Sequence, residues 1–207
     1  MTRRVVLATA NPDKAKEMTD ILRAALGPDV QVVPRPGGVP DVIEDGETLE
    51  ANARLKAAVI ASVADDPAVA DDTGLEVDAL GGAPGVRSAR FAGDDATYRD
   101  NVIKLLDALA ERPEPAERTA RFRTVAVALL PGGDEIVAEG IVDGTIARVP
   151  RGDGGFGYDS VFVPSEGDGR TFAEMTPAEK HAVSHRARAL TGLAVALALR
   201  TRSSGRE

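Results

Sequence analysis

Short runs rich in β-branched residues alternate along this chain with longer segments of helical periodicity. The pattern opens at residues 5–10 (VVLATA), an apolar run followed at once by a helical pattern over residues 13–26. No repeat, low-complexity tract or long linker interrupts the alternation. Because helices and strands must bury their apolar faces against one another, we expect an α/β fold with a mixed β-sheet flanked by helices. Other strand-like runs lie at 31–36, 68–80, 120–130, 135–150 and 160–164. Further helices are expected over residues 44–64, 97–112 and 177–199.

Capping residues mark where two of the predicted helices begin. Asn11 is a good N-cap, and Pro12 suits the first helical position because its missing N–H costs nothing there. Thr176 and Glu179 form a capping box, which predicts a last helix running through Leu199.

Charge and composition exclude several classes of function. The net charge of -8 argues against a broad basic face for nucleic acid, and the absence of cysteine excludes disulfides and thiol nucleophiles. The apolar runs are too short to cross a bilayer, and the N-terminus passes directly into a strand-like run, so we expect a cytoplasmic protein without membrane contact. We expect one domain over residues 1–200 and a flexible tail over residues 201–207.

The first candidate site is the segment TANPDK, which joins the first strand to the first helix. Such a junction directs backbone N–H groups and the positive end of the helix dipole to one point, where a lysine adds a full charge. The segment therefore favours a phosphate site, although any capped helix after a strand looks similar. Its residues are Thr9, Ala10, Asn11, Pro12, Asp13 and Lys14.

Acidic and basic residues in two further segments indicate a metal and phosphate site. Asn52 and Lys56 are four residues apart, on the expected buried face of a helix that follows Glu44. A lysine on a buried face must find an anion, because burying an isolated ammonium group is expensive. Asp71 and Asp72 are expected to end an apolar strand and to be followed by a second short strand. Adjacent carboxylates there are suitable magnesium ligands, although such a pair is also common in turns.

A glycine-rich loop at residues 152–159 (GDGGFGYD) is the fourth candidate. Its glycines match a dinucleotide-binding pattern, but they lie between two strand-like runs, which excludes that interpretation. Glycines around Phe156 and Tyr158 instead fit a loop that lets a flat base lie on an aromatic ring, and Asp159 could bond to that base. The alternative is a bulged hairpin with a packed phenylalanine.

The two histidines, His181 and His185, have the spacing of a zinc-protease motif, but Ala182 stands where that motif needs glutamate. A zinc protease is therefore rejected, and no P-loop or nucleophile-elbow motif is present. His185, Arg186 and Lys180 more plausibly donate to an oxo-base and to phosphates.

Taken in order, these segments resemble the inosine triphosphate pyrophosphatase family, the non-canonical purine NTP pyrophosphatases that include dITP/XTP pyrophosphatases. The resemblance spans nearly the whole chain and departs from the usual family motifs at Ala10 and Thr73, which replace Gly and Ser. The segments that carry it are VVLATANPDKAKEM, EDGETLEANARLKA, AVADDTGLEVDALGGAPGVRSARFAG, GGFGYDSVFVP and TFAEMTPAEKHAVSHRARAL.

The resemblance implies an elongated mixed sheet with helices in two lobes, a central active-site cleft, a magnesium cofactor and a homodimer. By similarity, Asp72 is the general base or a metal ligand, and Glu44 helps to bind magnesium. The residues implied to bind substrate are Thr9, Ala10, Asn11, Pro12, Asp13, Lys14, Lys56, Thr73, Phe156, Gly157, Tyr158, Asp159, Lys180, His185 and Arg186.

The predicted reaction is hydrolysis of ITP, dITP or XTP to the nucleoside monophosphate and pyrophosphate, which removes non-canonical purines from the nucleotide pool. Phosphoryl transfer depends mainly on positioning and charge neutralisation, which lysines and a metal supply. Two alternatives stay open. One is a pyrophosphatase for modified pyrimidine or methylated nucleotides, and the other is a nucleotide-sensing module without turnover.

Overall fold

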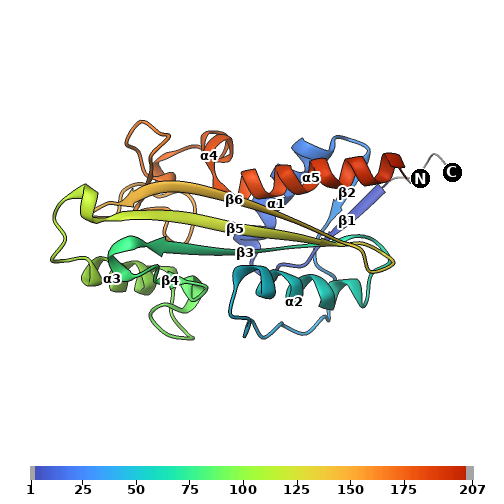
Figure 1. Cartoon of the computed structure of the whole chain (residues 1–207), viewed down its shortest axis with the longest axis horizontal. Helices are drawn as coiled ribbons and strands as arrows, with labels where there is room; N and C mark the ends of the chain where they lie inside the picture. The colour runs from blue at the N-terminus through green and yellow to red at the C-terminus, as the bar shows by residue number, and fades with distance from the viewer. Residues whose placement is uncertain (1–2, 204–207) are drawn as a thin grey trace. The chain divides into compact units, whose positions relative to one another are not determined.

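A mixed seven-stranded β-sheet forms the framework of the protein, whose computed structural model describes residues 3–203 (Figure 1). The strand order is β2-β1-β3-β5-β6-β7, with β4 pairing on β3. β1 is parallel to β2 and β3, whereas β4 and β7 pair antiparallel with β3 and β6. The strands are β1 (Arg3–Leu7), β2 (Val30–Val33), β3 (Ala68–Val77), β4 (Pro84–Gly85), β5 (Thr119–Leu129), β6 (Glu135–Ile146) and β7 (Phe162–Pro164).

The chain divides into two compact units. Unit 1 contains the residues up to Asp72, the segment Thr124–Gly140 and the chain from Arg186 onward. Unit 2 contains Thr73–Arg123 and Ile141–His185. β3, β5 and β6 therefore contribute residues to both units.

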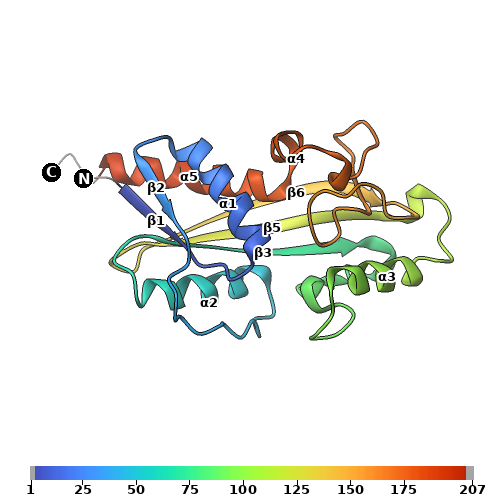
Figure 2. The same ribbon diagram turned by 180° about the vertical axis from the view of Figure 1, so that it is seen from behind.

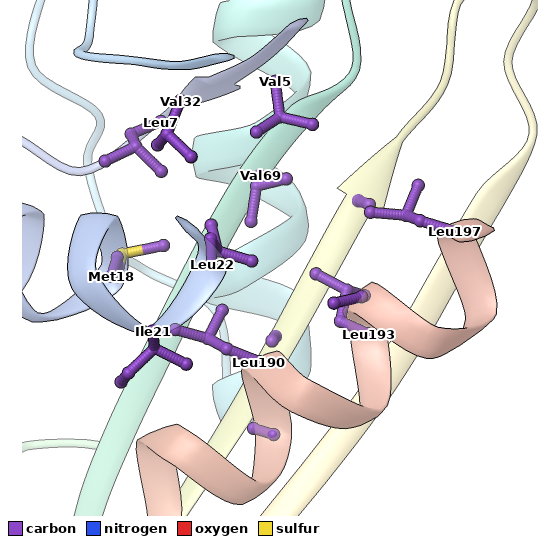
Figure 3. Close-up of a cluster of buried hydrophobic side chains, with 14 of the residues drawn as sticks. Val5, Leu7, Met18, Ile21, Leu22, Val32, Val69, Leu190, Leu193 and Leu197 are labelled. Atoms are coloured by element: carbon purple, nitrogen blue, oxygen red, sulfur yellow. The ribbon is translucent and has the colours of Figure 1, made fainter. Parts of the chain in front are cut away.

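In unit 1, helices cover both faces of the sheet (Figures 1 and 2). α1 (Pro12–Leu26) and α5 (His185–Ser203) lie on one face, and α2 (Leu49–Ala61) lies on the other. Figure 3 shows the apolar side chains of α1 and α5 directed towards those of the strands. This core explains the helical spacing of the apolar residues in α1 and α5. Its members include Val5, Leu7, Met18, Ile21, Leu22, Val32, Val69, Leu190, Leu193 and Leu197.

Unit 2 has its own core, which is rich in aromatic rings. Phe122 lies 4.7 Å from Phe162, centroid to centroid, and Phe172 lies 5.1 Å from Phe162. α3 (Tyr98–Ala108) contributes Val102 and Leu105 to the same cluster. The remaining helix of this unit, α4 (Pro177–Val183), begins at the predicted capping box.

The α/β class and the mixed sheet flanked by helices are confirmed, and β2 lies at one edge of the sheet. The prediction that a strand ends at Asp71 and Asp72 is wrong, because β3 continues through both acids to Val77. Both side chains have basic partners within unit 1, which lets two carboxylates lie inside a buried strand.

The prediction of a single last helix from residue 177 onward is also wrong. α4 ends at Val183, and Ser184 is extended with φ -76° and ψ 150° before α5 begins at His185. α5 then continues past Leu199 to Ser203, and the rest of the expected tail, residues 204–207, lies outside the described residues. Across residues 3–203, no helix combines the length and apolar character needed to cross a membrane.

Candidate functional site

The turn between β1 and α1 is fixed by side chains acting on the backbone. Asn11 caps α1, its side-chain oxygen accepting from the amides of Asp13 at 2.9 Å and Lys14 at 3.1 Å. The Thr9 hydroxyl accepts from the Asn11 amide at 3.1 Å. Two of the amides expected to face a phosphate are thus engaged by Asn11, so the charge of Lys14 and the helix dipole remain as the main attraction for an anion.

Lys56 joins two carboxylates that come from different parts of unit 1. Its ammonium nitrogen lies 2.8 Å from Asp72 Oδ1 and 2.9 Å from Glu44 Oε2. Asn52, one turn earlier on α2, places its amide nitrogen 3.4 Å from Asp72 Oδ2. The Asn52 oxygen accepts from the Gly46 amide at 2.8 Å, which ties the loop that carries Glu44 to α2. A Cβ at Gly46 would lie 2.6 Å from that oxygen, so only glycine fits this loop.

Asp71 pairs with basic residues on the face of β3 that α1 and α5 cover. This face is opposite the one on which Asp72 meets Lys56 of α2. Arg186 Nε donates to Asp71 Oδ2 at 3.0 Å and also pairs with Glu17 of α1. Lys14 Nζ lies 3.7 Å from Asp71 and 3.9 Å from Asp72, so it links the two carboxylates. The network contains both charge signs, and the side chains of Asp71 and Asp72 are 0% and 8% exposed. A ligand that binds these acids therefore competes with the cations that already pair with them.

These surroundings shift several pKa values. Burial favours the protonated form of Asp71, but the charges of Lys14 and Arg186 outweigh it and hold the pKa of Asp71 well below its usual range. Burial lowers the pKa of Lys14 more than Asp71 raises it. For Lys56 the balance is reversed, because Asp72, Asp71 and Glu44 together outweigh burial and raise its pKa.

The carboxylates suit a magnesium ion that is completed by a substrate. Within residues 3–203, no group of three His, Cys, Asp or Glu side chains could hold a metal by itself. Glu44 and Asp72 nevertheless converge on one cationic atom, Lys56 Nζ. Magnesium commonly takes one or two carboxylates and completes its shell with waters and substrate phosphates, so this pair fits it.

In unit 2, the glycine-rich loop is built around Asp159. Its Oδ2 accepts from the Phe156 amide at 2.9 Å and from Lys180 Nζ at 2.6 Å. Lys180 Nζ also lies 5.1 Å from the centroid of the half-buried Phe156 ring. Gly155 has φ +68°, and a Cβ there would lie 2.1 Å from Asp159 Oδ2, so glycine is required. A partly exposed ring thus lies beside a buried lysine–aspartate pair.

Two residues predicted to bind substrate lie in the core of unit 2. The Tyr158 hydroxyl donates to the Ser88 carbonyl oxygen at 2.9 Å, and burial raises the pKa of Tyr158. His185 is 2% exposed and stacks on Phe122 at 4.5 Å. Their positions favour a role in holding this unit together.

The predicted site residues divide between the two units. Those in unit 1 are Thr9, Ala10, Asn11, Pro12, Asp13, Lys14, Glu44, Lys56, Asp72 and Arg186, and those in unit 2 are Thr73, Phe156, Gly157, Tyr158, Asp159, Lys180 and His185.

The sequence pointed to Asp71, as one of a pair of suitable magnesium ligands, and to Asn52, as a neighbour of Lys56, but it did not point to Glu17 or Tyr98. Asn52 carried a usable signal, because it shares the buried helical face with Lys56. Asp71 carried one too, because a strand running through both acids places them on opposite faces. The partners of Glu17 and Tyr98 are distant in sequence, so neither had a local signal.

A mixed sheet with helices on both faces, two lysines among buried carboxylates, and an aromatic ring beside a lysine–aspartate pair define an α/β protein equipped for an anionic ligand. The model of the Ham1 family matches residues 5–196. The chain belongs to the Ham1 family, which confirms the resemblance seen in the sequence.

Named relatives and a solved structure agree with this assignment. The chain is 46% identical to the dITP/XTP pyrophosphatase of Geobacillus kaustophilus, covering 92% of each protein. It is 48% identical to the dITP/XTP pyrophosphatase of Shigella flexneri, covering 94% of this chain and 98% of the relative. A Ham1 protein from Coxiella burnetii has the same fold, with a TM-score of 0.82, 39% identity, and coverage of 95% of this chain and 98% of that one.

Proposed function

We propose that this protein hydrolyses non-canonical purine nucleoside triphosphates (ITP, dITP and XTP) to the monophosphate and pyrophosphate. The observation that carries the proposal is the position of Lys56 Nζ between Asp72 and Glu44, with Lys14 beside Asp72. Two lysines and two convergent carboxylates can hold a triphosphate and its cation at one place. The two relatives described above, both dITP/XTP pyrophosphatases, support the same reaction.

In the proposed mechanism, Lys14 and Lys56 neutralise the triphosphate and orient its α-phosphorus. Asp72 accepts the proton of the water that attacks this phosphorus, the bond to the bridging oxygen breaks, and pyrophosphate leaves. Asn52, whose amide nitrogen lies 3.4 Å from Asp72 Oδ2, holds the Asp72 carboxylate in position for that transfer. Asp71 acts indirectly, since it anchors Lys14 and Arg186.

The proposal includes magnesium, with Glu44 and Asp72 as its protein ligands. When bound, the ion supplies charge neutralisation for the phosphate oxygens and the leaving pyrophosphate. Lys56 releases the two carboxylates because the phosphates of the substrate offer it other acceptors.

Base selection is assigned to Phe156, Asp159 and Lys180 of unit 2. The base stacks on Phe156, and Lys180 donates to the 6-oxo group that hypoxanthine and xanthine carry. Adenine presents an amino group there, which leaves a buried donor unpaired and weakens its reaction on the order of a thousandfold. The proposal further includes a cytoplasmic location, where the nucleotide pool lies, and the homodimer implied by the family motifs.

The test is pyrophosphate release with magnesium from ITP, dITP, XTP, ATP, GTP and a set of modified pyrimidine or methylated nucleotides. We expect release from the first three and little from ATP, whose base lacks the 6-oxo group. We also expect little release from GTP, whose base carries that group and must be rejected through another contact, around position 2. Preference for the modified set would favour the alternative enzyme. Asp72→Asn should abolish release while nucleotide binding persists, and Asp45→Asn, an exposed acid in the Glu44 loop, is the matched control. Binding without release by the unmodified protein would identify a sensing module instead.

A further inference from the structure

A second aromatic ring lies beside Phe156 in unit 2. The ring centroids of Tyr98 and Phe156 are 5.8 Å apart, and the ring planes are inclined by 39°. Tyr98 is 41% exposed although it is one of only two tyrosines in a chain without tryptophan. Large aromatic surface is normally withdrawn from water, so the exposed Tyr98 ring and the half-buried Phe156 ring together offer a contact surface for another flat group.

The backbone at Tyr98 is anchored at the start of α3. Thr97 and Asp100 form a capping box, with the Thr97 amide donating to Asp100 Oδ2 at 2.9 Å and the Asp100 amide donating to Thr97 Oγ1 at 3.2 Å. Asn101 then ties α3 to the preceding loop, accepting from the Ala92 amide at 2.7 Å and donating to the Ala89 carbonyl oxygen at 3.0 Å. The Tyr98 backbone is therefore fixed before any ligand arrives.

Phe156 is fixed from the other direction. Asp159 accepts from its amide, and Lys180 lies over its ring while bonded to the same carboxylate. The Lys180 and Asp159 side chains are each only 5% exposed, so the polar end of this cluster is buried, whereas the Phe156 ring is half-buried.

We propose that Tyr98 is a specificity-determining residue of the base site, forming with Phe156 a two-ring surface that the fused rings of a purine cover. This inference rests on the function proposed above. It adds to the base site a residue of α3, which lies outside the glycine-rich loop and outside α4 and α5. A single-ring pyrimidine covers less of the surface, so Tyr98 favours purines over pyrimidines through binding.

The kinetic test compares Tyr98→Ala, Tyr98→Phe and the matched control Arg99→Ala, which changes the next exposed residue of α3. Loss of one aromatic contact should raise KM for ITP roughly three- to tenfold with kcat nearly unchanged, because the contact is made equally before and during reaction. Tyr98→Phe should restore KM, and Arg99→Ala should not change it. An unchanged KM in Tyr98→Ala, with folding verified by its melting temperature, would overturn the inference.

A binding measurement separates this inference from the proposed hydrolysis. Tyrosine fluorescence of the unmodified protein, corrected with free tyrosine for nucleotide absorbance, should be quenched by inosine monophosphate. The quenching should be absent in Tyr98→Phe, whose remaining tyrosine, Tyr158, is buried. Quenching without pyrophosphate release from any triphosphate would contradict the proposed reaction and leave the base contact standing. Pyrophosphate release with quenching that persists in Tyr98→Phe would overturn the role of Tyr98 alone.

Discussion

At the scale of single residues, Lys56 acts as a counter-ion for carboxylates that would otherwise repel each other. Its partners Asp72 and Glu44 are 2.8 Å and 2.9 Å away, and the Asp72 side chain is only 8% exposed. Lys56→Met should therefore lower the free energy of unfolding by about 3 kcal/mol, because a buried charge loses its partner. Magnesium should recover part of that loss, since the ion can occupy the place of the ammonium group.

Urea unfolding with and without magnesium measures both effects. The exposed Lys16 on α1 provides the control, because Lys16→Met changes charge equally without touching these carboxylates. An equal response of the two variants to magnesium would show that Glu44 and Asp72 do not bind the ion.

Lys14 should set the alkaline limit of activity. Burial lowers its pKa below the usual value, so the free enzyme loses this positive charge at a lower pH than an ordinary lysine would allow. We expect kcat/KM for ITP to fall as pH rises through that lowered pKa, and Lys14→Arg to extend the plateau upward because guanidinium stays protonated. A pH profile from 7 upward measures this, with Lys16→Arg as the control. If the alkaline limb of the profile does not move in Lys14→Arg, the loss of activity at high pH belongs to another titrating group.

The sequence indicated most of these charged residues but not how they pair. Lys56 and Asn52 were predictable because helical spacing places them together on a buried face. Asp71 was not separated from Asp72, because the pair was expected to end a strand. Within a continuous strand they face opposite sides, which brings Asp71 to Arg186 and Asp72 to Lys56. These partners are far apart in sequence, so only the fold reveals them.

At the scale of elements, the glycines of the glycine-rich loop differ in how much the fold depends on their lacking a side chain. Gly155 and Gly157 both have positive φ, at +68° and +61°, but only Gly155 has a neighbour where a Cβ would lie. Both alanine variants should lose about 1 kcal/mol from the left-handed backbone. Gly155→Ala should lose about 1–3 kcal/mol more, because the new methyl group displaces the Asp159 carboxylate.

Denaturant unfolding of the two variants tests this difference directly. Gly155→Ala should also weaken binding of inosine monophosphate, since Asp159 holds both the Phe156 amide and Lys180. Equal stability of the two variants would mean that the loop adapts without moving Asp159.

Most elements were predictable because their caps and periodicities are local, as with Asn11 at α1 and Thr176 at α4. The break at Ser184 was not, because no proline or glycine marks it. The extended Ser184 allows His185 to stack on Phe122 in unit 2 while Arg186 pairs with Asp71 in unit 1. This requirement comes from tertiary packing, which overrides a sequence that would favour one continuous helix.

At the scale of the whole molecule, the sequence predicted the layers but not the strand order. The order places β3 between β1 and β5, so the strand that carries both acids lies inside the sheet. Non-local pairing of this kind has no signal in a single sequence. The central position of β3 matters for function, because a strand covered on both faces can present Asp72 to α2 and Asp71 to α1 and α5.

Ligand binding should therefore stabilise the whole chain and depend on the cation. A non-hydrolysable α,β-methylene analogue of ITP at about 100 times its Kd contributes about 2.7 kcal/mol to the native state. For a chain of this length, that corresponds to a rise in Tm of about 5–10 °C with magnesium present. Chelation by EDTA should remove most of the rise, since Glu44 and Asp72 would then repel the phosphates.

Two variants assign that dependence to the carboxylates. Glu44→Gln should reduce the magnesium-dependent part of the rise, because it removes one charged ligand while keeping the shape of the side chain. Asp45→Asn changes an exposed neighbour in the same loop and should keep the full rise. Equal behaviour of the two variants would mean that general charge, and not coordination by Glu44, couples the cation to the nucleotide.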